Sequence, residues 1–194
     1  MTHIALIPGH GNRSRNGAWR WDPGATSDMG QEADIVRAVA ARVLELGGDR
    51  VSVHDSDRDG PWTYTSRRNS AHSAISADPG HWGVVCHVHV NAGGGDYILG
   101  MYDPRSTTGA GLAGSWCSTV ADMFDGRWRA RCIAATRPTW DHAANLIEPS
   151  YSVTPPGVAA VLLELGFIDN PTHRDRLTGD AIDVHARAIL DAWK

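Results

Sequence analysis

Short apolar runs rich in β-branched residues alternate along the chain with segments of helical spacing. The runs have the length of β-strands and lie at residues 3–8, 50–55, 83–90, 97–102, 131–136 and 157–167. Helical patterns cover residues 34–46, 64–77, 110–124 and 180–193. This alternation is typical of an α/β fold in which a parallel or mixed sheet is covered by helices.

One polar segment, residues 11–30, follows neither pattern and is interpreted as a long loop. Loops of that length in compact domains are usually functional or mobile. The chain has 194 residues and contains no internal repeat, low-complexity tract or obvious interdomain linker. We therefore expect a single domain over residues 1–194.

Composition and charge narrow the classes of function. The formal net charge is −4 and the Lys and Arg residues are scattered, which argues against binding of nucleic acid. No apolar stretch approaches the roughly 20 residues that a membrane-spanning helix needs. The three cysteines show no CxxC spacing, so the sequence predicts neither a disulfide framework nor a cysteine zinc site.

Side chains that can bind a metal or move protons stand at the ends of three predicted strands. His10 follows the first strand between two glycines, His89 lies at the end of the third, and Glu164 interrupts the last apolar run. In open α/β sheets, ligands bind beyond the carboxyl ends of the strands. Glu32, at the start of the first predicted helix, is expected near the same edge. The sequence thus predicts two histidines and two carboxylates in one place.

Each of these residues also has a structural interpretation. A histidine in a turn can bond a nearby carbonyl, and Glu32 in the first turn of a helix favours the positive end of the helix dipole by about 0.3–1 kcal/mol. His87 shares a strand face with His89 by period-two alternation and fits a core histidine better. Glu164 differs, because a carboxylate within AAVLLELGF is costly to desolvate unless a cation or hydrogen bonds compensate.

Two neutral imidazoles and one carboxylate form a three-ligand zinc site of the catalytic type, with a fourth position open to water. Such an ion lowers the pKa of bound water towards about 7 and polarises a carbonyl oxygen. A second carboxylate, not bound to the metal, can take the proton of that water and pass it to a leaving amine. Four residues would therefore suffice to hydrolyse an amide.

Four segments of the chain are similar to the motifs of a known family. LIPGHG resembles the family's opening DPGHGG, and Glu32 in GQEADIVRAVAARVLELG matches its metal-binding glutamate at the head of a helix. HVHVNAG is similar to SIHANA, and LLELGFIDNP is similar to VEVGFLSNP. Each motif alone is weak, but the four occur in order and the resemblance covers residues 4 to about 190. The chain resembles the zinc-dependent N-acetylmuramoyl-L-alanine amidases of the amidase-3 group, which cleave peptidoglycan between the muramic lactyl group and L-alanine.

The resemblance implies that His10, Glu32 and His89 bind Zn²⁺ and that Glu164 is the catalytic carboxylate. It implies a three-layer α/β fold with a mixed, mostly parallel sheet of about six strands and helices on both faces. It also implies a peptidoglycan substrate, bound in a groove whose expected walls are residues 11–30 and the segment NAGGGD at 91–96.

Three positions depart from the family pattern. Ile7 stands where the family has the aspartate of DPGHGG, Asn12 replaces its second glycine, and His72 replaces the asparagine of its Ala-Asn pair. These changes affect the support of the ligands more than the ligands themselves. Arg67 resembles the family's arginine before that pair, and we expect it to have a structural role.

Two other functions stay open. A zinc peptidase that cuts within the stem peptide of peptidoglycan would use the same chemistry, whereas a non-catalytic wall-binding module would need a missing ligand or base. We expect a monomer with no nucleic-acid partner. The start of the chain shows no export signal, which predicts a phage lysin that stays in the host cytoplasm until lysis. The alternative is a secreted or periplasmic bacterial amidase whose leader has been removed.

Overall fold

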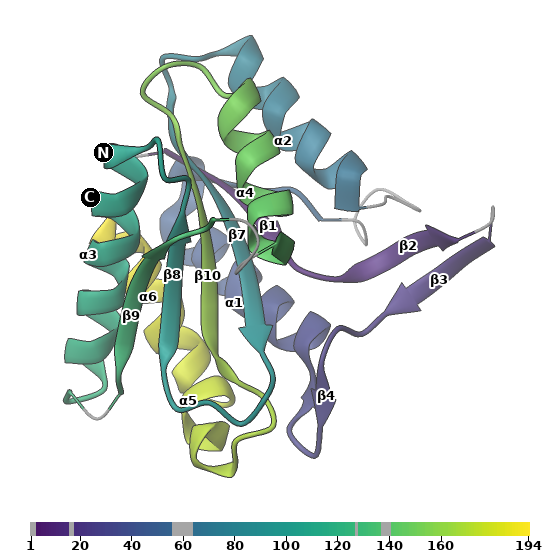
Figure 1. Ribbon diagram of the computed structural model, residues 1–194, viewed down its shortest axis with the longest axis vertical. Helices are drawn as coiled ribbons and strands as arrows, with labels where there is room; N and C mark the ends of the chain where they lie inside the picture. The colour runs from purple at the N-terminus through teal and green to yellow at the C-terminus, as the bar shows by residue number, and fades with distance from the viewer. Residues whose placement is uncertain (1–2, 16–17, 56–63, 127, 137–140) are drawn as a thin grey trace.

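A six-stranded mixed sheet forms the centre of the computed structural model, which describes residues 3–15, 18–55, 64–126, 128–136 and 141–194. In their order across the sheet, the strands are β6 (Val51–Val53), β1 (His3–Pro8), β7 (Trp82–Asn91), β10 (Ala159–Phe167), β8 (Ile98–Tyr102) and β9 (Ala130–Ala134). All neighbouring strands are parallel except β10 and β8, which are antiparallel. The expected sheet is confirmed (Figure 1).

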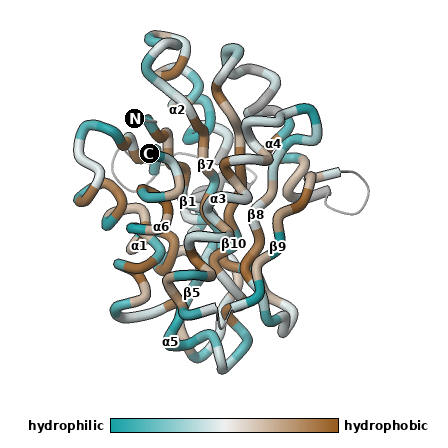
Figure 2. Tube along the Cα trace, turned by 90° about the vertical axis from the view of Figure 1, so that its left-hand side faces the viewer, coloured by the Kyte–Doolittle hydropathy of each residue, from teal (hydrophilic) through white to brown (hydrophobic). Residues whose placement is uncertain are grey.

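Helices cover both faces of this sheet, as the α/β pattern predicts. On one face lie α1 (Glu32–Gly47), α3 (Thr107–Met123) and α6 (Ala181–Ala192). On the other face lie α2 (Tyr64–Ala77) and α4 (Asp141–Val153), and the short α5 (Arg174–Leu177) precedes α6. Figure 2 shows hydrophobic residues along the central strands, where both helical layers pack. No helix in the described residues is long and apolar enough to cross a membrane.

Helix α1 shows how the apolar spacing produces this packing. Its buried apolar side chains recur at intervals of three and four residues, which places them on one face of a helix; they are Ala33, Ile35, Val36, Val39, Ala40 and Val43. The helix ends at Gly48, which adopts a left-handed φ of 54° and donates its backbone N–H to the carbonyl of Leu44. At the other end of the helix, the backbone N–H of Glu32, its first residue, donates to the carbonyl of Ala25 at 2.9 Å.

The expectation that residues 11–30 form one irregular loop is wrong. Strand β2 (Gly11–Arg15) pairs with β3 (Ala18–Asp22) as an antiparallel ribbon that reaches away from the sheet, and β4 (Thr26–Ser27) pairs with β5 (Gly30–Gln31) (Figure 1). Pairing lets these backbone groups bond each other, so a polar segment needs no apolar alternation to form strands. The pair Asn-Gly at 16–17 is the sequence signal for a tight hairpin, although those two residues lie outside the described part.

Two helices differ from the predicted pattern. Helix α3 begins at Thr107, earlier than expected, because the Ser106 side chain accepts a hydrogen bond from the backbone N–H of Gly109 at 2.9 Å and caps it. Helix α4 occupies a segment to which the apolar pattern assigns no element. Its sequence contains a proline, which usually argues against a helix, yet Ala143 and Ile147 pack against the sheet.

The topology brings the carboxyl ends of three parallel strands, β1, β7 and β10, together at one end of the sheet. In the register of β1 with β7, Pro8 lies beside Val88, so His10 follows just beyond the point where His89 stands. In the register of β10 with β7, Glu164 lies beside His89. Because neighbouring residues in register point to the same side of a sheet, the positions predicted to carry chemistry are collected there.

Candidate metal centre

His10, Glu32 and His89 come together from three separate elements. His10 lies in the turn after β1, Glu32 begins α1, and His89 lies near the end of β7. One ligand atom from each side chain lies within 4.8 Å of the other two. Glu32 and His89 are buried, and His10 is partly exposed. Among the described residues, this is the group of His, Cys, Asp and Glu side chains arranged to hold a metal ion.

The carboxylate of Glu32 is the centre of this group. Its Oε1 lies 3.0 Å from Nδ1 of His89, and its Oε2 lies 3.2 Å from Nε2 of His10. Backbone N–H groups of Val90 and Ala25 donate to the same two oxygens, each at 3.0 Å. Burial alone would raise the pKa of Glu32, but the hydrogen bonds from His10 and His89 hold it well below its usual range. The carboxylate is therefore charged and oriented between the two imidazoles.

The same contacts act on His10. Burial alone would lower its pKa, but hydrogen bonding and attraction from Glu32, and to a smaller extent from Asp22, raise it above the usual value. Asp22, the last residue of β3, places Oδ2 3.5 Å from Nδ1 of His10. A carboxylate behind a ligating histidine fixes the orientation of its ring. Sequence reasoning does not find Asp22, because the polar pattern predicts only a loop over residues 11–30.

Two glycines allow these side chains to approach so closely. A Cβ atom on Gly9 would lie 2.5 Å from the ring of His89, and one on Gly24 would lie 2.5 Å from Oε2 of Glu32 and 2.6 Å from the ring of His10. Gly24 also has a φ of +69°, which other residues rarely adopt. The backbone thus forms a close wall around the three side chains that only glycine permits.

Gly24→Ala is expected to weaken metal binding strongly. The new methyl group would displace Glu32 and His10, and the positive φ would cost roughly 1–2 kcal/mol of stability. Gly179→Ala is the matched control, because Gly179 has a similar φ of +58° but a methyl group there would meet no atom of the described residues within 4 Å. Thermal unfolding and zinc titration of both variants separate the two effects. Equal zinc affinity in the two variants would contradict the claim that a methyl group at position 24 displaces Glu32 and His10.

Glu164 lies next to this group without being part of it. It stands beside His89 in the register of β10 with β7, and its Oε2 is buried with no hydrogen-bond partner among the described residues. Burial raises the pKa of Glu164 well above its usual value, and the nearby charge of Glu32 raises it further. A carboxylate made more basic in this way is suited to accept a proton and to return it.

His87 and Ile7, one of the positions that depart from the family motifs, are part of the core. His87 is buried on the face covered by α4, where its Nε2 lies 3.0 Å from Oγ of Ser150, and burial holds its pKa well below the usual value. Ile7 is fully buried against Ala71 and Ile75 of α2. Its side chain therefore packs α2 against the sheet, at the position where the family has an acid.

The loop after His89 is joined to the loop after Glu164. Asp169 accepts hydrogen bonds from the backbone N–H groups of Gly93 and Gly94, at 2.7 and 3.0 Å. Nδ2 of Asn170 donates to the carbonyl of Gly95 at 2.7 Å. The glycine-rich segment that the sequence predicts as a wall of the groove is thus tied to the strand that carries Glu164.

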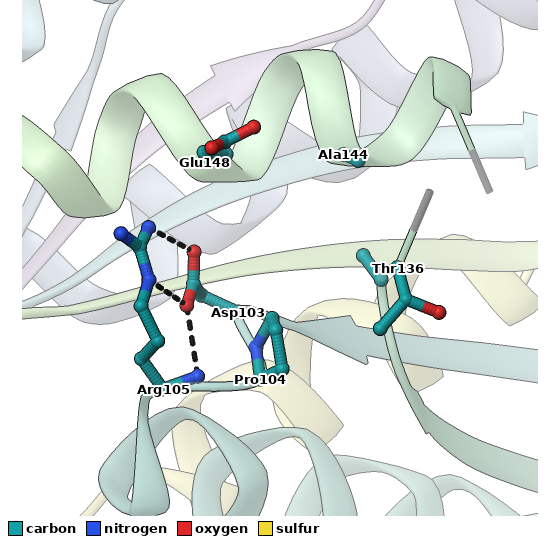
Figure 3. A pocket seen from close by; sticks show the side chains of 7 residues that line it. Asp103, Pro104, Arg105, Thr136, Ala144 and Glu148 are labelled. Atoms are coloured by element: carbon teal, nitrogen blue, oxygen red, sulfur yellow. Dashed lines mark hydrogen bonds and ion pairs between the residues drawn. The ribbon is translucent and has the colours of Figure 1, made fainter. Parts of the chain in front are cut away.

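A pocket of about 330 Å³ lies elsewhere, among residues at the ends of β8 and β9 and on α4. Figure 3 shows Asp103 and Arg105 paired on one side of it, with Glu148 and Ala144 of α4 on the other. Since β8 runs antiparallel to β10, the carboxyl end of β8 lies at the opposite end of the sheet from Glu164. This pocket is therefore separate from the candidate metal centre.

Comparisons with known proteins agree with this arrangement. The family model of the N-acetylmuramoyl-L-alanine amidases called amidase-3 matches residues 4–193. Comparison with curated protein sequences gives no match. Among solved structures, the chain is similar to N-acetylmuramoyl-L-alanine amidase AmiC2 of Nostoc punctiforme, at 17% identity and a TM-score of 0.66, with 98% of this chain and 94% of that chain covered.

Two further structures have a similar fold. Cwp6 from Clostridium difficile is 20% identical with a TM-score of 0.70, and the match covers 99% of this chain and 29% of that one. The catalytic domain of the CD27L endolysin targeting Clostridia difficile is 18% identical with a TM-score of 0.66, and the match covers 99% and 96% of the two chains. Because the family model spans nearly the whole sequence, the chain belongs to the amidase-3 family and is an N-acetylmuramoyl-L-alanine amidase, an enzyme that hydrolyses peptidoglycan.

Proposed function

We propose that this amidase depends on zinc, held by His10, Glu32 and His89, and that Glu164 is its catalytic carboxylate. The observation that carries the proposal is the meeting of these three side chains within 4.8 Å, beside a carboxyl group whose Oε2 has no hydrogen-bond partner in the described part of the chain. Two imidazoles and one carboxylate are the donor set of many catalytic zinc sites. The close approach of Gly9 and Gly24 keeps these donors in a small space, which fits a single ion.

When bound, the ion would supply the positive charge that polarises the scissile carbonyl and makes a water molecule acidic. The protein's own contribution is proton transfer. Glu164 takes the proton of the attacking water and then gives it to the amine of L-alanine, which leaves as the carbon–nitrogen bond breaks. Its raised pKa favours this exchange, because a more basic carboxylate is a better acceptor. Asp22 holds the ring of His10 while this occurs.

Digestion of purified sacculi tests the reaction directly. We expect free amino groups on L-alanine and no new reducing sugar ends, because the bond cut joins muramic acid to the peptide. A peptidase acting within the stem would expose a different amino terminus, and a wall-binding module would release nothing. New reducing ends would indicate a glycosidase and would contradict the proposal.

We also propose that the protein acts as a phage lysin, which stays in the host cytoplasm until lysis and then reaches the cell wall. The support for this role is the similarity of its fold to the CD27L endolysin catalytic domain. Expression inside a bacterium with a matching wall should leave cells intact until the inner membrane is permeabilised, after which they should lyse. Lysis that is independent of permeabilisation, or export of the chain by the bacterium itself, would favour a secreted amidase instead.

A further inference from the structure

The turn that presents His10 is held by two arginines. Nη1 of Arg37 donates to the carbonyl of Gly9 at 3.4 Å, and its Nη2 donates to the carbonyl of His10 at 3.3 Å. Nη1 of Arg67 donates to the carbonyl of Pro8. Three consecutive carbonyl groups at the end of β1 are therefore bonded to guanidinium groups from α1 and α2.

Asp55, in the segment after β6, lies beside both arginines. Its Oδ1 lies 2.9 Å from Nη2 of Arg37 and 4.0 Å from Nη1 of Arg67. The side chains of Arg37, Asp55 and Arg67 are 15%, 10% and 1% exposed, so these interactions are largely shielded from water. Arg37 is further fixed by the carbonyl of Ala33 at 2.8 Å. We call Arg37, Asp55 and Arg67 the arginine clamp.

This turn needs such support because its backbone is strained. His10 has a φ of 55°, a left-handed conformation that costs an L-residue roughly 1–2 kcal/mol. Gly9 before it has no room for a Cβ because of the ring of His89. Strained residues persist where the surrounding structure over-determines their conformation. The arginine clamp bonds the carbonyls on both sides of the strained position and so fixes the direction in which the imidazole leaves the backbone.

We propose that Arg37, supported by Asp55 and Arg67, is a positioning residue that holds His10 ready to bind the metal. This inference rests on the proposed zinc dependence. The two arginines serve the fold rather than the substrate, since their side chains are largely buried and already bonded to backbone carbonyls. Guanidinium groups suit this role because their planar fork can serve several acceptors at once. A lysine at position 37 would keep the charge but has one ammonium group for three carbonyls and a carboxylate.

Metal affinity of the full chain tests the clamp without relying on activity. Metal-free wild type, Arg37→Lys and Asp55→Asn would be titrated with Co²⁺, recording the visible spectrum, and zinc affinity would be measured by competition with a chromophoric chelator. Losing support of a ligand typically costs about 10–100-fold in metal affinity. We expect losses in that range for Arg37→Lys, a loss in the same direction for Asp55→Asn, and an altered Co²⁺ spectrum in both.

Arg42→Lys is the matched control, because Arg42 is on the same helix and pairs with Glu45 and Asp183, away from the turn. It should bind both ions as the wild type does. Wild-type affinity and spectrum in Arg37→Lys would overturn the inference and leave the proposed function intact. If Arg37→Lys does not fold, the same result in Asp55→Asn overturns it. A wild type that binds neither ion would refute the proposed function, and this inference with it.

Discussion

Glu164→Gln is expected to retain zinc and to lose nearly all hydrolysis. Glutamine keeps the shape of the side chain but cannot accept the proton of the attacking water, and general acid–base groups contribute typically about 10²–10⁴-fold to rate. We therefore expect kcat to fall by at least that range, with zinc affinity close to the wild type. The measurement is release of L-alanine amino groups from sacculi, alongside zinc content.

The same variant also tests a second, independent expectation, which concerns stability. Oε2 of Glu164 is buried without a hydrogen-bond partner among the residues that the structure describes, and its pKa is raised, so the charged carboxylate is costly in the metal-free fold. A neutral amide has no charge to desolvate and no proton to take up on folding, so metal-free Glu164→Gln should unfold at a temperature no lower than the wild type. Glu148→Gln, an exposed carboxylate on α4, is the control for both measurements. Wild-type turnover in Glu164→Gln would remove Glu164 from the mechanism.

Glu32→Gln should lose both the metal and the activity. The charged carboxylate bonds the imidazoles of His10 and His89, and an amide of the same size carries no charge to attract a cation. Loss of a supporting group alone costs about 10–100-fold in metal affinity, so loss of a ligand is expected to exceed that range. Zinc competition and digestion of sacculi measure the two effects.

Glu45→Gln provides the comparison for this variant. Glu45 lies near the end of the same helix, is largely exposed and pairs with Arg42. It should bind zinc and digest peptidoglycan as the wild type does. Retention of zinc by Glu32→Gln with undiminished affinity would show that Glu32 orients the histidines without binding the ion.

The sheet could be predicted from the sequence because its central strands are largely apolar and buried on both faces. The segment AAVLLELGF, for example, has no polar residue except Glu164, and such runs are typical of strands buried on both sides. Helix α1 is equally clear from its spacing. The β2–β3 ribbon does not follow from the hydrophobic pattern, because both strands are only five residues long and β2 is polar; the Asn-Gly pair between them is the local signal for the hairpin.

The candidate site was predictable only in part, for a related reason. His10, Glu32 and His89 stand at strand and helix ends that the hydrophobic pattern locates, and their order follows a family motif. Asp22 and Gly24 act through the geometry of turns and of the ribbon, which side-chain pattern does not reveal. The arginine clamp joins residues from α1, α2 and the segment after β6, so only the folded topology brings its members together.

The central claim is that a zinc ion held by His10, Glu32 and His89 makes this amidase work. Its most direct test is elemental analysis of the purified chain, combined with digestion of sacculi before chelation, after chelation and after zinc is restored. The account predicts one zinc per chain, loss of digestion when the zinc is removed and recovery when it returns. A chain that holds no metal and digests peptidoglycan at full rate after chelation would contradict it.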